Sequence, residues 1–180
     1  MGIDLSHDAI AAANRIAELT GLSHLAEFLV ADASALPFPD RTFTVVWNQC
    51  SLKHDEKWLK EFDRVLIPGG RLALTFQLRG RNSDEDGPFS RWTLPDVIAV
   101  VEGMGYSIGH AQDITERDIE IGWRQLDRII ERDRAEFAAV LGEEWVNKAH
   151  QEFMGEIDAM RTGRWGNGRL VAVKPTSTRG

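Results

Sequence analysis

The side chains best suited to chemistry lie in a polar stretch, residues 48–54, that directly follows the apolar run 43–47. His54 is a candidate general base because imidazole exchanges a proton near neutral pH. Its equally plausible roles are to cap the next helix or to pair with Asp55. Cys50 is expected to be a small buried residue rather than a nucleophile. This stretch therefore offers acid–base and hydrogen-bonding groups at one point of the chain.

Residues 43–76 read as strand, loop, helix, turn and strand, which is a βαβ unit. The β-branched run 43–47 predicts a strand buried on both faces. Helical spacing then follows, and residues 68–70, Pro-Gly-Gly, end the helix before a second buried strand at 72–76. The two strands are expected to be parallel, with ligands beyond their carboxyl ends. This places a site at residues 48–54 and after Phe76.

The flanking segments predict further helices and strands. Ser6 is a suitable N-cap for a helix that ends at Gly21, and Thr93 with Asp96 forms a capping pair for another. Strands are expected at residues 25–31, 106–111 and 170–173, the last of them antiparallel. Residues 79–91 are a polar loop, either a flap over the site or a solvated connection.

Residues 115–163 carry two amphipathic helical faces, which need a surface to cover. Trp123, Trp145 and Phe153 are predicted to form a core between helices, with direct substrate contact as the alternative. The segment 165–168, Trp-Gly-Asn-Gly, is predicted to be a turn. Its first residue, Trp165, is a candidate pocket-lining residue.

Composition limits the classes of protein to consider. The chain has 180 residues, of which 43% are hydrophobic and 27% charged, as in a soluble globular domain. A net charge of −7 argues against nucleic acid as a partner. A single cysteine permits no intrachain disulfide, and no apolar run approaches a membrane span. We expect a cytoplasmic protein without a metal site.

Four pieces in order carry a resemblance: GIDLS (2–6), ADASALPFPDRTF (31–43), TVVW (44–47) and RVLIPGG (64–70). They resemble the second half of a class I S-adenosylmethionine-dependent methyltransferase core, over residues 1 to about 110. The resemblance implies a Rossmann-like α/β fold with S-adenosyl-L-methionine as cofactor. It divides the chain into a partial core (1–114), a helical lid inserted before the last strand (115–163), and the last strand with a tail (164–180).

The resemblance also implies roles for individual residues. Asp4 would accept hydrogen bonds from the cofactor ribose, with Leu5 packed on the adenine. Asp32 and Ala33 would hold the adenine through the carboxylate and a backbone N–H, and Asn48 would face the methionine part. The alternatives are that Asp4 caps the next helix and that Asp32 is only a turn residue.

The string VVWNQCSLKH is similar to one in small-amine N-methyltransferases of the sarcosine and dimethylglycine type. Gln49 and His54 match it and would orient or deprotonate a small-molecule acceptor, whereas Cys50 stands where an acidic residue is common. Trp123 and Trp165 would contact that substrate. The acceptor atom, nitrogen, oxygen or carbon, stays open.

The family's Gly-x-Gly-x-Gly loop and first strand are expected before Asp4, where only three residues stand. We therefore expect a sheet that lacks its first strand and glycine-rich loop, as in an N-terminally truncated enzyme. The alternative is a cofactor-free binding module or partner subunit, completed by a homodimer or by another chain. A dinucleotide-dependent dehydrogenase explains GIDLS but not RVLIPGG.

Overall fold

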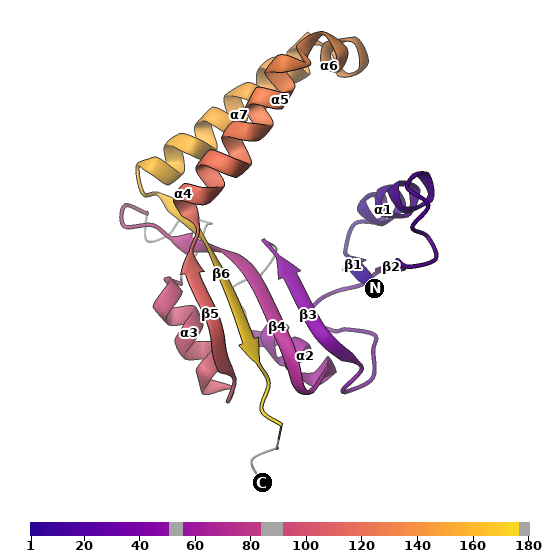
Figure 1. Ribbon diagram of the computed structural model, residues 1–180, viewed down its shortest axis with the longest axis vertical. Helices are drawn as coiled ribbons and strands as arrows, with labels where there is room; N and C mark the ends of the chain where they lie inside the picture. Colours follow the sequence, from indigo (N-terminus) through magenta and orange to yellow (C-terminus); the bar gives the residue numbers. More distant parts are fainter. Residues whose placement is uncertain (51–55, 84–91, 177–180) are drawn as a thin grey trace. The chain divides into compact units, whose positions relative to one another are not determined.

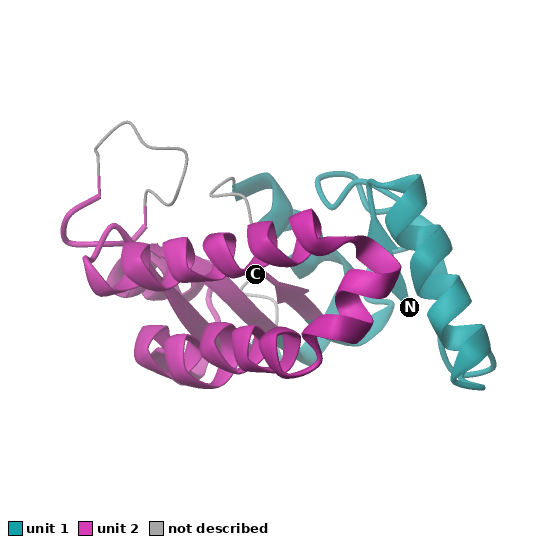
Figure 2. Ribbon diagram, turned by 90° about the horizontal axis from the view of Figure 1, so that it is seen from above, with its two compact units in different colours: residues 1–46, 55–72, 173–180 teal, residues 47–54, 73–172 magenta. Residues whose placement is uncertain are grey.

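The computed structural model describes residues 1–50, 56–83 and 92–176. His54 therefore lies outside the described residues, as does most of the predicted flap. The chain divides into two compact units (Figure 2). Unit 1 comprises Met1–Val46, Asp55–Leu72 and Val173–Gly180, and unit 2 comprises Trp47–His54 and Ala73–Ala172.

Unit 1 begins with a small two-stranded parallel sheet, β1 (Gly2–Asp4) and β2 (Phe28–Val30), in which Asp4 pairs with Val30. Helix α1 (His7–Leu19) connects the two strands. Its N-terminus is the predicted one, because the Ser6 side chain accepts a hydrogen bond from the Ala9 N–H at 3.2 Å. Strand β2 is shorter than the predicted 25–31.

The larger sheet has four strands in the order β3 (Phe43–Gln49), β4 (Leu66–Arg79), β6 (Trp165–Val173) and β5 (Ser107–Asp113), as Figure 1 shows. Gly70 is hydrogen-bonded to Lys174, and further along β4 Phe76 lies against Gly168. Residue numbers thus rise along β4 as they fall along β6, so the pair is antiparallel, as predicted.

The predicted burial of residues 43–47 on both faces is wrong. Strand β3 is at the edge of its sheet, and Val45 and Trp47 on one face of it are 49% and 69% exposed. The predicted helix after it is present as α2 (Glu56–Val65), with one fully buried face. That face comprises Trp58, Leu59, Phe62 and Val65. The α/β class is therefore confirmed. The predicted turn at residues 68–70 is wrong, because α2 ends at Val65 and these residues lie within β4.

In unit 2, α3 (Leu94–Gly103) has the predicted capping box, in which Thr93 and Asp96 bond reciprocally. The segment after β5 is mostly helical, beginning with α4 (Thr115–Arg117), the π-helix η1 (Asp118–Trp123) and α5 (Arg124–Arg132). Helices α6 (Arg134–Leu141) and α7 (Glu143–Arg161) complete it. Helices α5 and α7 lie side by side (Figure 1). Among the described helices, none combines the length and apolar composition that crossing a membrane requires.

The predicted turn at residues 165–168 is wrong, because these residues open strand β6. The glycines of this strand do not form a turn. They allow side chains of neighbouring elements to approach the backbone closely. A Cβ on Gly166 would lie 2.4 Å from Thr115 Oγ1, and one on Gly168 would lie 2.8 Å from the Phe76 ring.

Candidate functional site

Two carboxylates lie at the carboxyl end of the small sheet in unit 1. Asp4 is the last residue of β1, and Asp32 follows the end of β2 by two residues. The strands are parallel and in register, and the Ala31 N–H donates to the Asp4 carbonyl at 3.0 Å. Both carboxylates are exposed. The sequence therefore brings these two predicted residues together at the carboxyl ends of neighbouring parallel strands, where ligands of α/β proteins bind.

Asp4 orders the start of α1. Its Oδ1 accepts the Ser6 N–H at 2.7 Å, and Ser6 is the residue that caps the helix, so Asp4 supports the cap without supplying it. Within the described residues, only Oδ1 of this carboxylate takes part in a hydrogen bond. The neighbouring Leu5 is 57% exposed. An acceptor oxygen and an apolar side chain thus stand together at the strand end, open to a ligand that has both hydroxyls and an aromatic ring.

Asp32 forms a turn after β2. Its Oδ1 accepts the Ser34 N–H at 2.8 Å, and its carbonyl accepts the Ala35 N–H at 3.0 Å. The turn role is therefore present at Asp32. Ala33 lies between, half-buried. The turn fixes the backbone at the position where the resemblance requires a defined N–H and carboxylate.

An ion-paired network that sequence reasoning missed holds the connector after Asp32. Arg64 donates to the Leu36 carbonyl at 2.9 Å and to the Phe38 carbonyl at 2.7 Å. It also donates to both Glu61 oxygens at 2.8 Å and to Asp40 Oδ1 at 2.9 Å. Glu61 in turn accepts the Leu36 N–H at 2.7 Å. The connector 36–40 is thus fastened to α2 through its backbone.

Charge and hydrogen bonding shift the pKa values of both Glu61 and Arg64. The hydrogen bond from Arg64 lowers the pKa of Glu61, and the bond to Leu36 lowers it further, whereas burial opposes both. The hydrogen bond to Glu61, followed by that to Asp40, raises the pKa of Arg64. The sequence could have indicated the Glu61–Arg64 ion pair, because the two residues are three apart. It could not have indicated the carbonyl partners of Arg64, which lie 26 and 28 residues away.

Unit 2 contains the described part of the predicted polar stretch. Asn48 is buried and Gln49 is exposed. Cys50 is exposed, which contradicts its expected burial. The Cys50 N–H donates to the Thr75 carbonyl at 2.9 Å and to Thr75 Oγ1 at 3.1 Å, with φ at 52°. Cys50 Sγ also lies 3.5 Å from Thr75 Oγ1, so both the backbone and the side chain of Cys50 contact β4 at the end of β3.

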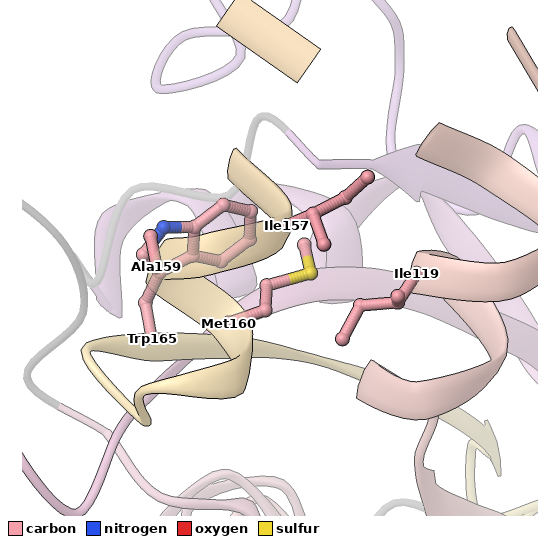
Figure 3. Close-up of a cluster of buried hydrophobic side chains, with 5 residues drawn as sticks. All are labelled: Ile119, Ile157, Ala159, Met160 and Trp165. Carbon is pink, nitrogen blue, oxygen red and sulfur yellow. The ribbon is translucent and has the colours of Figure 1, made fainter. Parts of the chain in front are cut away.

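Trp165, one of the two tryptophans predicted to contact substrate, belongs to an apolar cluster (Figure 3). Trp165 is 9% exposed and lies in that cluster, and Trp123 packs against it. The other members are Ile119, Ile157, Ala159 and Met160. The Trp123 ring also lies 5.7 Å from that of Phe153, centroid to centroid. Core packing between helices accounts for these contacts, and substrate contact stays a prediction.

Asn167 is a second feature that sequence reasoning missed. It is buried in β6, and its Nδ2 donates to Asp118 Oδ2 at 2.7 Å. Its backbone N–H donates to Thr115 Oγ1 at 3.0 Å. Among the described residues no hydrogen-bond donor reaches its Oδ1. The bond to Asp118 ties the start of the π-helix to the last strand, and the glycines on both sides of Asn167 were the only signal.

Comparison with known proteins finds a family match over the first part of the chain. Residues 1–74 match the family described as methyltransferase domain. Tocopherol O-methyltransferase of Arabidopsis thaliana is 42% identical over 77 residues, which are 41% of this chain and 22% of that protein. Phosphoethanolamine N-methyltransferase 1 of Zea mays is 26% identical over 185 residues, covering 97% of this chain and 36% of that protein. The chain thus spans about a fifth to a third of the length of these curated relatives.

The fold has a solved counterpart in Haemonchus contortus phosphoethanolamine N-methyltransferase 2. That structure, in complex with phosphomonomethylethanolamine and S-adenosylhomocysteine, superposes with a TM-score of 0.85 at 20% identity. The match covers 97% of this chain and 43% of that one. At this identity the likeness establishes the fold.

Proposed function

We propose that this chain, whose residues 1–74 match the methyltransferase-domain family, is a class I S-adenosylmethionine-dependent methyltransferase that binds the adenosine part of S-adenosylmethionine and serves methyl transfer to a small molecule. The observation that supports the proposal is the pair of exposed carboxylates, Asp4 and Asp32, at the ends of two neighbouring parallel strands. Both lie within the matched residues 1–74.

Each residue at the carboxyl ends of β1 and β2 would contact one part of adenosine. The Asp4 carboxylate can accept from both ribose hydroxyls, since it has two oxygens and Ser6 engages one of them. The exposed Leu5 would pack on the adenine face. The turn at Asp32–Ala33 would present a carboxylate to the exocyclic amine and an N–H to a ring nitrogen. The Glu61–Arg64 network keeps the next connector in place.

The cofactor would supply a sulfonium-activated methyl group, so the protein mainly aligns the acceptor with it. We assign that alignment to Gln49 and His54, with Asn48 beside the methionine part of the cofactor. Relatives named as phosphoethanolamine N-methyltransferases match most of the chain, so a small amine is the first acceptor class to screen. The 180 residues contain no Gly-x-Gly-x-Gly motif, so we further propose that the methionine part needs a segment beyond them.

The test is calorimetric titration of the chain with S-adenosylhomocysteine, comparing wild type with Asp4→Asn. The asparagine keeps an oxygen for the Ser6 N–H but loses the second acceptor. Loss of a charge-assisted hydrogen bond should weaken binding about tenfold or more. Asp8→Asn is the matched control, because Asp8 is an exposed carboxylate in the first turn of α1.

Saturable binding that depends on Asp4 but not on Asp8 supports the proposal. If the wild type does not bind, or if Asp4→Asn binds as tightly, the adenosine assignment is wrong. That result would favour the alternative function, a methyltransferase-like binding module without a cofactor. Such a module would bind a partner chain, which analytical ultracentrifugation of the purified complex would detect.

A further inference from the structure

Three side chains with metal-binding atoms converge between the long helices of unit 2. Asp127 and Glu131 are four residues apart on α5 and share a face, and His150 faces them from α7. His150 Nδ1 lies 2.7 Å from Asp127 Oδ1 and 3.8 Å from Glu131 Oε1. One ligand atom of each residue lies within 4.8 Å of the other two. The three therefore point at a common position from two separate helices.

The three side chains lie beside a buried apolar cluster and are partly exposed to solvent. Ile130, Val146 and Ala149, neighbours of these residues on the same two helices, form a buried apolar cluster. The side chains of Asp127, Glu131 and His150 are 18%, 38% and 45% exposed. An ion can reach them from solvent, while the packed cluster fixes the separation of the helix backbones.

The ion pair between Glu131 and Arg134 does not prevent Glu131 from binding a metal ion. Arg134 Nη1 donates to both oxygens of Glu131, at 2.9 and 3.1 Å. Arg134 is also held by Glu143 at 2.9 Å and by Asn147. If Glu131 turns toward an ion, Arg134 keeps these two other partners, so no cation is left isolated.

We propose that Asp127, Glu131 and His150 bind a divalent transition-metal ion of the Zn²⁺ class, which joins α5 to α7. Ligand atoms on a tetrahedral zinc ion at about 2.1 Å lie about 3.4 Å from one another. The Nδ1–Asp127 separation must therefore widen by about 0.7 Å and the Nδ1–Glu131 separation must shorten by about 0.4 Å, which side-chain rotation can supply. The ion replaces the proton that His150 and Asp127 now share.

The donor set determines the class of ion. One imidazole nitrogen with two carboxylate oxygens suits Zn²⁺, Co²⁺ and Ni²⁺, whereas Ca²⁺ and Mg²⁺ prefer all-oxygen sites. The two carboxylates balance the charge of the ion, and three protein ligands leave a coordination position for water. The sequence offered little signal, because His150 is 19 residues beyond Glu131 and no compact metal-binding spacing is present.

The test is titration of the tag-free, chelator-treated full chain with Co²⁺, followed by its visible absorption, and then displacement by Zn²⁺. We expect one ion per chain. His150→Ala and Asp127→Asn should each weaken binding at least about tenfold. His24→Ala and Glu152→Gln are matched controls, since His24 is exposed in unit 1 and Glu152 is an exposed carboxylate on α7. Both should bind as wild type does.

Thermal unfolding separates metal binding from simple helix packing. Zn²⁺ should raise the melting temperature of the wild type and of both controls, but not that of His150→Ala or Asp127→Asn. The proposal is wrong if the wild type binds no Co²⁺ below about 100 µM, a concentration that a three-ligand site should readily bind. It is equally wrong if the ligand variants respond to both ions as the controls do.

Discussion

Replacing Glu61 by glutamine (Glu61→Gln) should loosen the connector that follows Asp32. The carboxylate accepts three hydrogen bonds, from Arg64 Nε at 2.8 Å, Arg64 Nη2 at 2.8 Å and the Leu36 N–H at 2.7 Å. An amide has one oxygen. If it occupies the Oε2 position it serves Leu36 and Nη2, and its NH₂ then faces Arg64 Nε, donor against donor. At least one charge-assisted bond is lost in either orientation.

The magnitude follows from that loss. A hydrogen bond to a charged group contributes about 1.5–3 kcal/mol, and the side chain of Glu61 is only 20% exposed, so we expect a destabilisation of about 1–2 kcal/mol. With a urea m-value of about 2 kcal/mol/M, the unfolding midpoint should fall by about 0.5–1 M. Glu18→Gln is the matched control, because Glu18 pairs with Arg15 at the same spacing on an exposed surface and should change little.

The same variant predicts a pH dependence. Hydrogen bonding from Arg64 holds the pKa of Glu61 below its usual 4.5, so the carboxylate stabilises the fold above that pH. This contribution is lost as the pH falls through the lowered folded-state pKa. The midpoint difference between wild type and Glu61→Gln should thus be full near pH 7 and shrink in acid. Equal midpoints at pH 7, or a difference that persists unchanged at pH 3, would refute this account of the connector.

Three further substitutions test the fold. Gly80→Ala should destabilise by about 1–3 kcal/mol in urea unfolding, because its Cβ would lie 2.1 Å from the Gly163 carbonyl; an unchanged midpoint contradicts that close approach. Gly155→Ala meets no atom within 4 Å inside α7 and should instead stabilise by about 0.5–1 kcal/mol. Asp96→Asn should lower the melting temperature near neutral pH, since bonds from Thr93 lower the pKa of Asp96. The difference should shrink as the pH falls below the usual value of 3.8 and through the lowered folded-state pKa.

The features that could be predicted from the sequence are local ones. The Ser6 N-cap and the Thr93–Asp96 capping box are formed by residues three apart, so the short motif contains the whole interaction. The buried face of α2 follows from helical spacing in the same way. Asp4 and Asp32 were identified through the resemblance to the methyltransferase family, and the parallel register brings their strand ends together.

The features that could not be predicted depend on partners distant in the sequence. Gly166 and Gly168 have the composition of a turn, but they lie in strand β6, where Thr115 and Phe76 approach them closely. Cys50 was expected in the core because small apolar residues favour it, yet its backbone is fastened to Thr75, 25 residues away. Likewise His150 becomes a neighbour of Asp127 and Glu131 only when α7 packs on α5.

The most direct test of the central claim, that β1 and β2 present an adenosine site, is a pair of titrations of this chain. One uses S-adenosylhomocysteine, and the other uses 5′-methylthioadenosine, which has the adenosine part but no amino-acid part. The account predicts that both bind saturably and that Asp4→Asn weakens both about tenfold, since the proposed partner of Asp4 is the ribose that they share. Absence of binding by both ligands, or affinities that Asp4→Asn leaves unchanged, would contradict it.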